Sequence, residues 1–136
     1  MTASMIRAEG VSKKYRIGAL VATYTTLRES IMAVAKAHNL YVVEDAAPSA
    51  GAEFNGQRTG SFGHFGCFSF HPSKNLSAAG DGGAVVARNA ELDEALRRQR
   101  ELGQVGQNNH VVVGFNTKLD ALQARILSWK LPHLER

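Results

Sequence analysis

Residues 65–87 decide the fold of this chain: they have the sequence Phe65-Gly-Cys-Phe-Ser-Phe70, His71-Pro-Ser-Lys-Asn-Leu-Ser-Ala-Ala-Gly-Asp-Gly82 and Gly83-Ala-Val-Val-Ala87. The two outer stretches are apolar and predict strands, whereas the middle stretch is too rich in glycine and small residues to be a core element. Upstream, Leu40-Tyr-Val-Val-Glu44 is a short run of the kind that is buried in a parallel sheet. Because α/β sheets keep their chemistry in loops at strand ends, residues 71–82 are a candidate site.

Helical patterns surround these strands. The spacing of Leu27, Ile31, Val34, Ala35 and His38 predicts a helix that Thr25 caps and Asn39 ends. A strand is expected over Met5–Glu9, and Asn55-Gly56 predicts a two-residue β-hairpin turn. Helices that alternate with buried strands are typical of an α/β protein.

Two further helices are expected towards the C-terminus. Asn89 can cap a helix from Ala90 to Leu102, with acidic residues in its first turns, arginines in its last and Gly103 closing it. Thr117-Lys-Leu-Asp120 resembles a capping box with Asp in place of Glu. An apolar stripe follows, which Pro132 ends, and its members are Leu119, Leu122, Ile126 and Trp129.

Composition sets the class of protein. The chain has 136 residues, enough for one domain of ordinary size or a piece of a larger one, and its 44% hydrophobic and 21% charged residues exclude a disordered chain. The sequence contains neither a long apolar run nor a secretory signal, so we expect a soluble, cytoplasmic protein. The single Cys67 excludes an internal disulfide. The net charge of +4 points weakly to phosphates as partners, and the arginines at 97–100 are better explained by a solvated helix end than by nucleic-acid binding.

Three side chains fit one mechanism. Asp45 follows one expected strand, Ser69 lies near the end of another, and Lys74 lies five residues later among small residues. A partly desolvated lysine there would favour its neutral, nucleophilic amine. Spacing leaves simpler readings open: a solvated Lys74, an Asp45 that closes a turn, and a Ser69 that satisfies backbone groups.

A metal site is the other possibility that the sequence raises. His64, Cys67 and His71 lie close together, but a zinc site needs three or four ligands and no second pair matches. Gly80-Asp-Gly-Gly83 is neither a dinucleotide fingerprint nor a P-loop, and is better explained as a tight turn into the next strand.

Four groups of residues occur in order: Val43-Glu-Asp-Ala-Ala47, Gly60-Ser-Phe-Gly63, Phe68–Val86 with Ser-Lys-Asn-Leu76 and Gly80-Asp-Gly-Gly83, and Gly114-Phe-Asn-Thr-Lys-Leu-Asp-Ala-Leu-Gln-Ala124. Together they resemble the DegT/DnrJ/StrS family of nucleotide-sugar aminotransferases, which use pyridoxal 5'-phosphate (PLP), from about residue 31 to residue 136. The resemblance implies part of the large α/β/α domain of the aspartate-aminotransferase-like fold. It also implies transfer of an amino group, typically from glutamate, to a keto group on a nucleotide-linked sugar, for amino-sugar, surface polysaccharide or antibiotic synthesis.

The resemblance also assigns roles to residues. Lys74 matches the lysine that bonds covalently to PLP and then moves protons, and Asp45 matches the carboxylate that faces the pyridine nitrogen. Ser69 matches a hydroxyl that binds the cofactor phosphate. Asn116 matches a residue that reaches the phosphate of the neighbouring subunit, which implies a homodimer, although Asn116 could instead support the loop before its helix.

One position departs from the family pattern, and another bears on the branch of the family. The family often has Gln where this chain has Pro48, and Pro48 has no side-chain donor for the cofactor ring hydroxyl. The dehydratase branch has His at the position of Lys74, so Lys74 favours transamination.

The ends of the chain suggest a partial enzyme. Family members are much longer, and we expect residues 31–136 to be a partial large domain and residues 1–30 to be an unrelated segment. Met5–Arg16 resembles the opening strand and adenine-stacking Tyr15 of polysaccharide-export ABC ATPases, but no P-loop follows. We therefore expect a truncated or fused reading frame, joined near residues 30–33, with weak or absent activity. The alternatives are a non-catalytic remnant or binding module and, less favoured, a fragment of an exporter ATP-binding subunit.

Overall fold

The computed structural model describes residues 27–134, and the chain divides into two units, residues 1–42 and 43–136. In the first unit, helix α1 spans Leu27–Ala37 and buries Ala35. The backbone of Asn39 turns into the left-handed region, with φ of 52°, so the helix ends where the sequence predicts. The predicted cap at Thr25, the predicted strand at Met5–Glu9 and Tyr15 lie outside the described residues.

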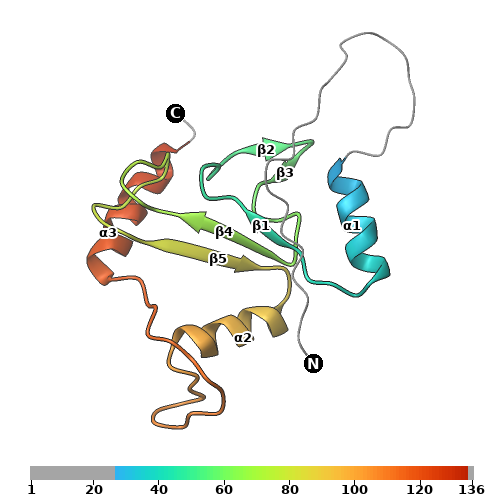
Figure 1. Ribbon diagram of the computed structural model, residues 1–136. Helices are drawn as coiled ribbons and strands as arrows, with labels where there is room; N and C mark the ends of the chain where they lie inside the picture. The colour runs from blue at the N-terminus through green and yellow to red at the C-terminus, as the bar shows by residue number, and fades with distance from the viewer. Residues whose placement is uncertain (1–26, 135–136) are drawn as a thin grey trace, which may run out of the picture. The chain divides into compact units, whose positions relative to one another are not determined.

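A three-stranded sheet forms the centre of the second unit. Its strands are β1 (Val43–Asp45), β4 (Phe65–Ser69) and β5 (Gly83–Ala87), in the order β1-β4-β5 (Figure 1). β1 runs parallel to β4, whereas β5 runs antiparallel to it. The strands predicted over residues 65–70 and 83–87 are confirmed, as is the loop between them.

Strand β1 departs from the prediction of a buried strand over residues 40–44. It begins at Val43 and ends at Asp45, and Val43 is 53% exposed. The reason is its place in the sheet: within residues 27–134, β1 pairs only with β4, so its other edge has no strand beside it. Because the strand ends at Asp45, this residue is the last one of the strand rather than the first one after it.

The predicted β-hairpin is present between β1 and β4. Strands β2 (Glu53–Phe54) and β3 (Gln57–Arg58) pair antiparallel around Asn55 and Gly56. Both turn residues have positive φ, 51° and 75°. This is the backbone that a two-residue hairpin turn requires and that Asn-Gly adopts readily, so the prediction is confirmed.

Helix α2 spans Ala90–Arg100 and contacts β5 (Figure 1). Asn89 caps it as predicted, because its side chain accepts a hydrogen bond of 2.9 Å from the backbone of Leu92. The helix ends two residues before the predicted Leu102. Gly103, with φ of 73°, closes it by donating its N–H to the carbonyl of Arg98 at 2.7 Å.

Helix α3 spans Ala121–Lys130 and continues into the short 3₁₀ helix η1, Leu131–His133. The predicted capping box is wrong: Asp120 is itself the N-cap residue, and its side chain makes no cap hydrogen bond. The predicted apolar stripe is correct only in part as a buried face: Leu119 packs against the core, whereas Leu122 and Trp129 are 69% and 66% exposed. Leu127, which the stripe omitted, is the buried residue, because the surface facing the helix comes from residues 50–78.

The hydrophobic core of the second unit is small. Its buried members are Ala50, Leu76, Ala78 and Leu127, and Phe68, Phe70, Leu119 and Leu134 pack against them. The core therefore lies where the loops after β1 and β4 meet helix α3. Burial of these side chains stabilises the two loops and not only the strands.

Candidate functional site

Asp45 and Ser69 lie on one face of the sheet at the same end. Both are the last residues of their strands, and parallel pairing brings the carboxyl ends of β1 and β4 together. Asp45 is the register partner of Cys67, and Ser69 lies two residues beyond Cys67 on β4. Since side chains in a strand alternate between faces, the three side chains share one face.

Lys74 lies in a turn just beyond β4. Its N–H donates to the carbonyl of His71 at 2.9 Å, and the residue is half-buried. The base of its loop is closed by two backbone bonds of 2.8 Å, from Phe70 to Gly82 and from Ala78 to Phe70. The turn therefore projects from the same end of the sheet that carries Asp45 and Ser69 (Figure 1).

One side chain joins the loop of Lys74 to the loop that follows Asp45. The amide nitrogen of Asn75 donates to the carbonyl of Ala50 at 2.5 Å, across 25 positions in the sequence. Ala50 and Leu76 also pack in the same hydrophobic cluster. The loops that follow the two parallel strands are thus held together by a polar and an apolar contact.

Helix α3 holds the other side of the Lys74 loop. The ammonium group of Lys130 donates to the carbonyl and the hydroxyl of Ser77, at 2.8 and 3.0 Å. The side chain of Gln123 accepts the N–H of Ala79 at 2.9 Å. Backbone groups of the irregular loop are thereby paired, which a part-buried loop requires.

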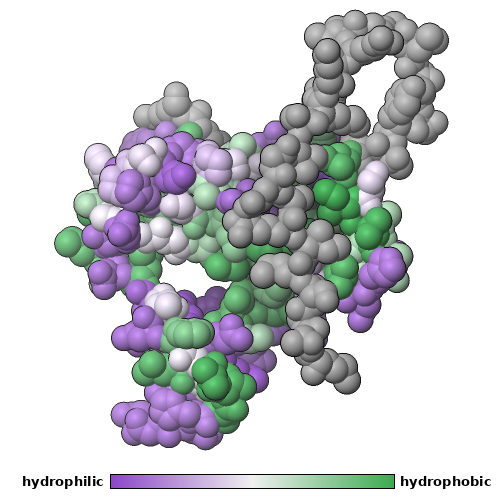
Figure 2. Space-filling view, in the orientation of Figure 1, coloured by the Kyte–Doolittle hydropathy of each residue, from purple (hydrophilic) through white to green (hydrophobic). Residues whose placement is uncertain are grey.

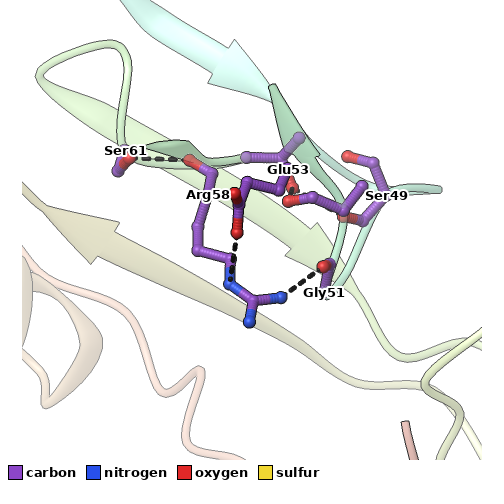
Figure 3. A network of polar contacts seen from close by, with 7 residues as sticks. Ser49, Gly51, Glu53, Arg58 and Ser61 are labelled. Carbon is purple, nitrogen blue, oxygen red and sulfur yellow. Dashed lines mark hydrogen bonds and ion pairs between the residues drawn. The ribbon is translucent and has the colours of Figure 1, made fainter. Parts of the chain in front are cut away.

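The hairpin holds the loop after β1 in place. The guanidinium of Arg58 donates to the carbonyl of Gly51 at 2.6 Å and lies 3.5 Å from the carboxylate of Glu53 (Figure 3). The hydroxyl of Thr59 donates to the carbonyl of Ser49 at 2.6 Å. Glu44 accepts the N–H groups of Gly60 and Phe62, at 2.7 and 3.0 Å. The segment 49–51, which follows Asp45, is therefore bonded at both of its ends, by Thr59 at Ser49 and by Arg58 at Gly51.

Cys67 shows the electrostatic effect of Asp45. Burial raises the pKa of the Cys67 thiol above its ordinary value, and the negative charge of Asp45 raises it further. The thiol is thus kept protonated rather than activated as a nucleophile.

Asn116 lies in the segment between α2 and α3. It is exposed, and its backbone forms an isolated bridge with Glu101 at the end of α2. It belongs to residues 103–117, which we name the arm. Large apolar side chains of the arm are exposed, and Figure 2 shows green residues among purple ones in this part of the surface; they are Val105, Val111, Val112, Val113 and Phe115.

A hollow of about 590 Å³ lies between β5 and α2. Cys67, Arg97, Arg100 and Phe115 are among the residues that line it, whereas the four predicted site residues are not. Within residues 27–134, no group of three or more His, Cys, Asp or Glu side chains could hold a metal ion. No helix in this part of the chain is long and apolar enough to cross a membrane.

Comparison with known proteins identifies the family. A family model described as the DegT/DnrJ/EryC1/StrS aminotransferase family matches residues 27–136. The chain belongs to this family. The match begins four positions before the boundary that the sequence suggested at residue 31, and it contains all four predicted site residues.

Individual family members agree with this assignment. The chain is 55% identical over 104 residues to the UDP-N-acetyl-3-dehydro-alpha-D-glucosamine 3-aminotransferase of Acidithiobacillus ferrooxidans, covering 76% of this chain and 28% of that protein. A DegT DnrJ EryC1 StrS aminotransferase from Brucella abortus superposes with a TM-score of 0.77 at 39% identity, over 82% of this chain and 30% of that one. The chain thus spans less than a third of the length of these relatives.

A third relative bears on the cofactor. The structure of ntda from Bacillus subtilis, with bound cofactor PMP, has a TM-score of 0.69 and 28% identity, over 81% of this chain and 25% of that one. The predicted fold class, an incomplete α/β part of the PLP-dependent transferase fold, is confirmed by these neighbours.

Three residues that hold the site together could not be recognised from the sequence alone. Asn75, Gln123 and Lys130 have no chemical signature of their own, and their partners are backbone groups 25 to 53 positions away. Asn75 and Gln123 did lie inside the groups of residues that suggested the family, which is the signal that could have found them. Lys130 was indistinguishable from a solvated lysine.

Proposed function

We propose that this chain is the part of a PLP-dependent nucleotide-sugar aminotransferase that supplies Lys74, Asp45 and Ser69 to the cofactor site. The observation that carries the proposal is the bond from Asn75 to Ala50, which ties the loop of Lys74 to the loop that follows Asp45. In the same proposal, residues 31–136 are part of the large domain and residues 1–30 are a separate segment.

The three side chains fit the chemistry of PLP. Asp45 is exposed and accepts one backbone bond, from Ala47 at 3.1 Å, which leaves acceptor capacity for a protonated ring nitrogen. The hydroxyl of Ser69 accepts the N–H of His71 at 3.3 Å, so its own hydrogen can be donated to a phosphate oxygen. Lys74 offers the amine. An amine, a carboxylate and a hydroxyl are the groups that an aldehyde, a ring nitrogen and a phosphate need.

Each residue would have a separate task. When bound, PLP supplies an aldehyde and a ring that accepts electrons from the reacting carbon. The Nζ atom of Lys74 would hold the cofactor in the resting enzyme and, once free, would carry a proton to or from the reacting carbon. The carboxylate of Asp45 would keep a proton on the ring nitrogen, because a negative charge favours the charged form of a neighbouring base. Ser69 would orient the phosphate.

The substrate assignment rests on the relatives. The Acidithiobacillus ferrooxidans relative is named as an aminotransferase of a UDP-linked sugar. We propose a nucleotide-linked keto sugar as the acceptor here, with glutamate as the donor, in amino-sugar or surface polysaccharide synthesis in the cytoplasm.

We also propose a homodimer in the complete enzyme, in which Asn116 reaches the phosphate bound by the neighbouring subunit. Its support is that Asn116 is exposed on the arm and bridged to Glu101, rather than to the residues around Lys74. Sedimentation of the protein with and without PLP tests the dimer. A chain that stays monomeric under both conditions contradicts it.

Trapping of the cofactor tests the main proposal. The protein is mixed with PLP and reduced with borohydride, and the adduct is mapped by mass spectrometry. We expect one adduct, at Lys74, which is lost in Lys74→Ala and kept in Lys118→Ala, because Lys118 is an exposed lysine paired with Glu101. Labelling spread over several lysines would instead support the non-catalytic remnant, and ATP binding abolished by Tyr15→Ala would favour the exporter fragment.

A further inference from the structure

The turn that carries Lys74 contains a histidine with an unusual set of bonds. The N–H of His71 donates to the hydroxyl of Ser69 at 3.3 Å, and its carbonyl accepts the N–H of Lys74 at 2.9 Å. Its ring nitrogen Nδ1 lies 3.2 Å from the backbone nitrogen of Ser73 and 2.9 Å from the hydroxyl of Ser73. His71 therefore touches each of the three polar residues that surround the turn.

These contacts assign the tautomer of the imidazole ring. A backbone N–H can only donate, so Nδ1 must accept from Ser73 and carries no proton. The tautomer that this geometry assigns has its ring proton on Nε2. The hydroxyl of Ser73 must donate to the same nitrogen, which leaves its lone pairs free to accept.

The bond closes the turn where the backbone would otherwise be least constrained. Pro72 has no N–H and fixes its own φ, so the N–H of Ser73 is the first backbone donor after His71. A side chain that accepts a bond from the backbone two residues later mimics a backbone turn, as Asn and Asp do. His71 is exposed, so it contributes this bond rather than packing in a core.

We propose that His71 is a positioning residue for Lys74: its unprotonated Nδ1 holds Ser73 and thereby the backbone from which the Lys74 amine projects. The functional consequence rests on the role proposed above for Lys74, whereas the bond itself does not. His71 stays outside the reacting groups and acts through the turn.

Three variants of the full chain test this inference. His71→Ala removes the acceptor, and His71→Asn replaces Nδ1 with an amide oxygen at a similar position. We expect the amide hydrogen of Ser73 to exchange roughly three- to tenfold faster in His71→Ala, the effect of losing one such bond, and to stay near the wild-type rate in His71→Asn. His110→Ala is the matched control, because His110 lies on the arm and its ring contacts the carbonyl of Leu102, so the variant should leave Ser73 unchanged.

A second measurement reads the ring directly. Two-dimensional ¹⁵N–¹H spectra of the imidazole at neutral pH should show the Nε2–H form for His71. A proton on Nδ1, an unchanged exchange rate in His71→Ala, or faster exchange in His71→Asn as well as in His71→Ala would each overturn the inference.

Trapping with PLP separates this inference from the proposed function. If the wild-type chain forms its adduct at Lys74, the rate of adduct formation should fall by a factor of a few in His71→Ala and recover in His71→Asn. If the wild-type chain forms no adduct there, the proposed function fails, and the exchange and ring measurements still decide whether His71 holds the turn.

Discussion

Residues 71–82 and the arm, residues 103–117, are both irregular, and each carries one predicted site residue, yet they are held in different ways. The loop of Lys74 is anchored by side chains from distant segments, namely Asn75, Gln123 and Lys130. The arm is anchored mainly by backbone bonds to the nearby end of α2, such as the bond of 2.7 Å from Phe115 to Gln99. The loop buries Leu76 and Ala78, whereas the arm leaves its large apolar side chains exposed.

The difference indicates which part of the protein surrounds each predicted site residue. The anchors of the Lys74 loop all lie in the described part of this chain. The exposed valines and Phe115 of the arm form a surface that residues 27–134 do not cover. This contrast supports a Lys74 site built within one chain and an Asn116 that acts on a neighbouring surface, as proposed above.

Removal of a buried side chain tests the comparison with the largest expected effect. Leu76 is 7% exposed and packs against Ala50, Ala78 and Leu127, so Leu76→Ala should lower the free energy of unfolding by about 2–3 kcal/mol. Val113 is 85% exposed, and Val113→Ala on the arm should change it by less than about 0.5 kcal/mol. Urea denaturation measures both, and equal losses would mean that the two regions do not differ as described.

A pair of glycines tests how the arm is held. Gly103 and Gly106 have nearly the same φ, 73° and 74°. A Cβ atom at Gly103 would overlap the carbonyl oxygen of Val112, whereas one at Gly106 would meet nothing within 4 Å. Thermal unfolding should therefore show a loss of about 2 kcal/mol or more for Gly103→Ala and about 1 kcal/mol for Gly106→Ala. Similar losses would show that the contact between Gly103 and Val112 is unimportant.

The hydrogen bond from Asn75 to Ala50 should contribute less to the free energy of unfolding than the buried side chain of Leu76. Asn75→Ala leaves the carbonyl of Ala50 without its donor and should lower the free energy of unfolding by about 1–2 kcal/mol. The yield of the PLP adduct at Lys74 should fall with it. Gln104→Ala is the control on the arm, because the contact of Gln104 with His110 is exposed and 3.4 Å long. A full adduct yield in Asn75→Ala would show that the bond from Asn75 to Ala50 is not needed to form the site, and the proposed function would lose its main support.

The smallest expected effect concerns the shared face of Asp45 and Cys67. Burial is the larger cause of the raised thiol pKa, and Asp45 is the smaller one. Asp45→Asn removes the negative charge, so the pKa should fall, the thiolate fraction at pH 8 should rise, and alkylation of Cys67 should become faster by a factor of a few. Asp81→Asn, the same change in the loop before β5, should leave the rate unchanged. An unchanged rate in Asp45→Asn would show that the two side chains do not interact.

Local signals in the sequence predicted most of the fold. Asn55-Gly56 encodes its own turn, Asn89 and Gly103 mark the ends of α2, and β4 and β5 lie where their apolar runs predict. Apart from the predicted capping box before α3, the failures concern burial. The apolar composition of residues 40–44 predicts a buried strand, but exposure of Val43 depends on which strands lie beside β1. The face of α3 that is buried depends in the same way on loops far away in the sequence.

The candidate site followed the same division. Asp45, Ser69 and Lys74 could be chosen from the sequence because carboxylate, hydroxyl and amine groups at strand ends suggest chemistry, and the structure brings the ends of β1 and β4 together. Their roles stay predictions. The supporting contacts of Asn75 and Lys130 could not be predicted, since nothing local to either residue specifies a backbone carbonyl at position 50 or 77.

The contacts from α3 determine when the site is completed during synthesis of the chain. Gln123 and Lys130 lie 44 and 53 positions after the groups they bind. Domains fold as the ribosome releases them, N-terminal segments first. Strands β1, β4 and β5 can therefore pair on the nascent chain before residues 71–82 have formed their hydrogen bonds with Gln123 and Lys130. A cofactor added during translation would meet the completed loop only after helix α3 has left the exit tunnel.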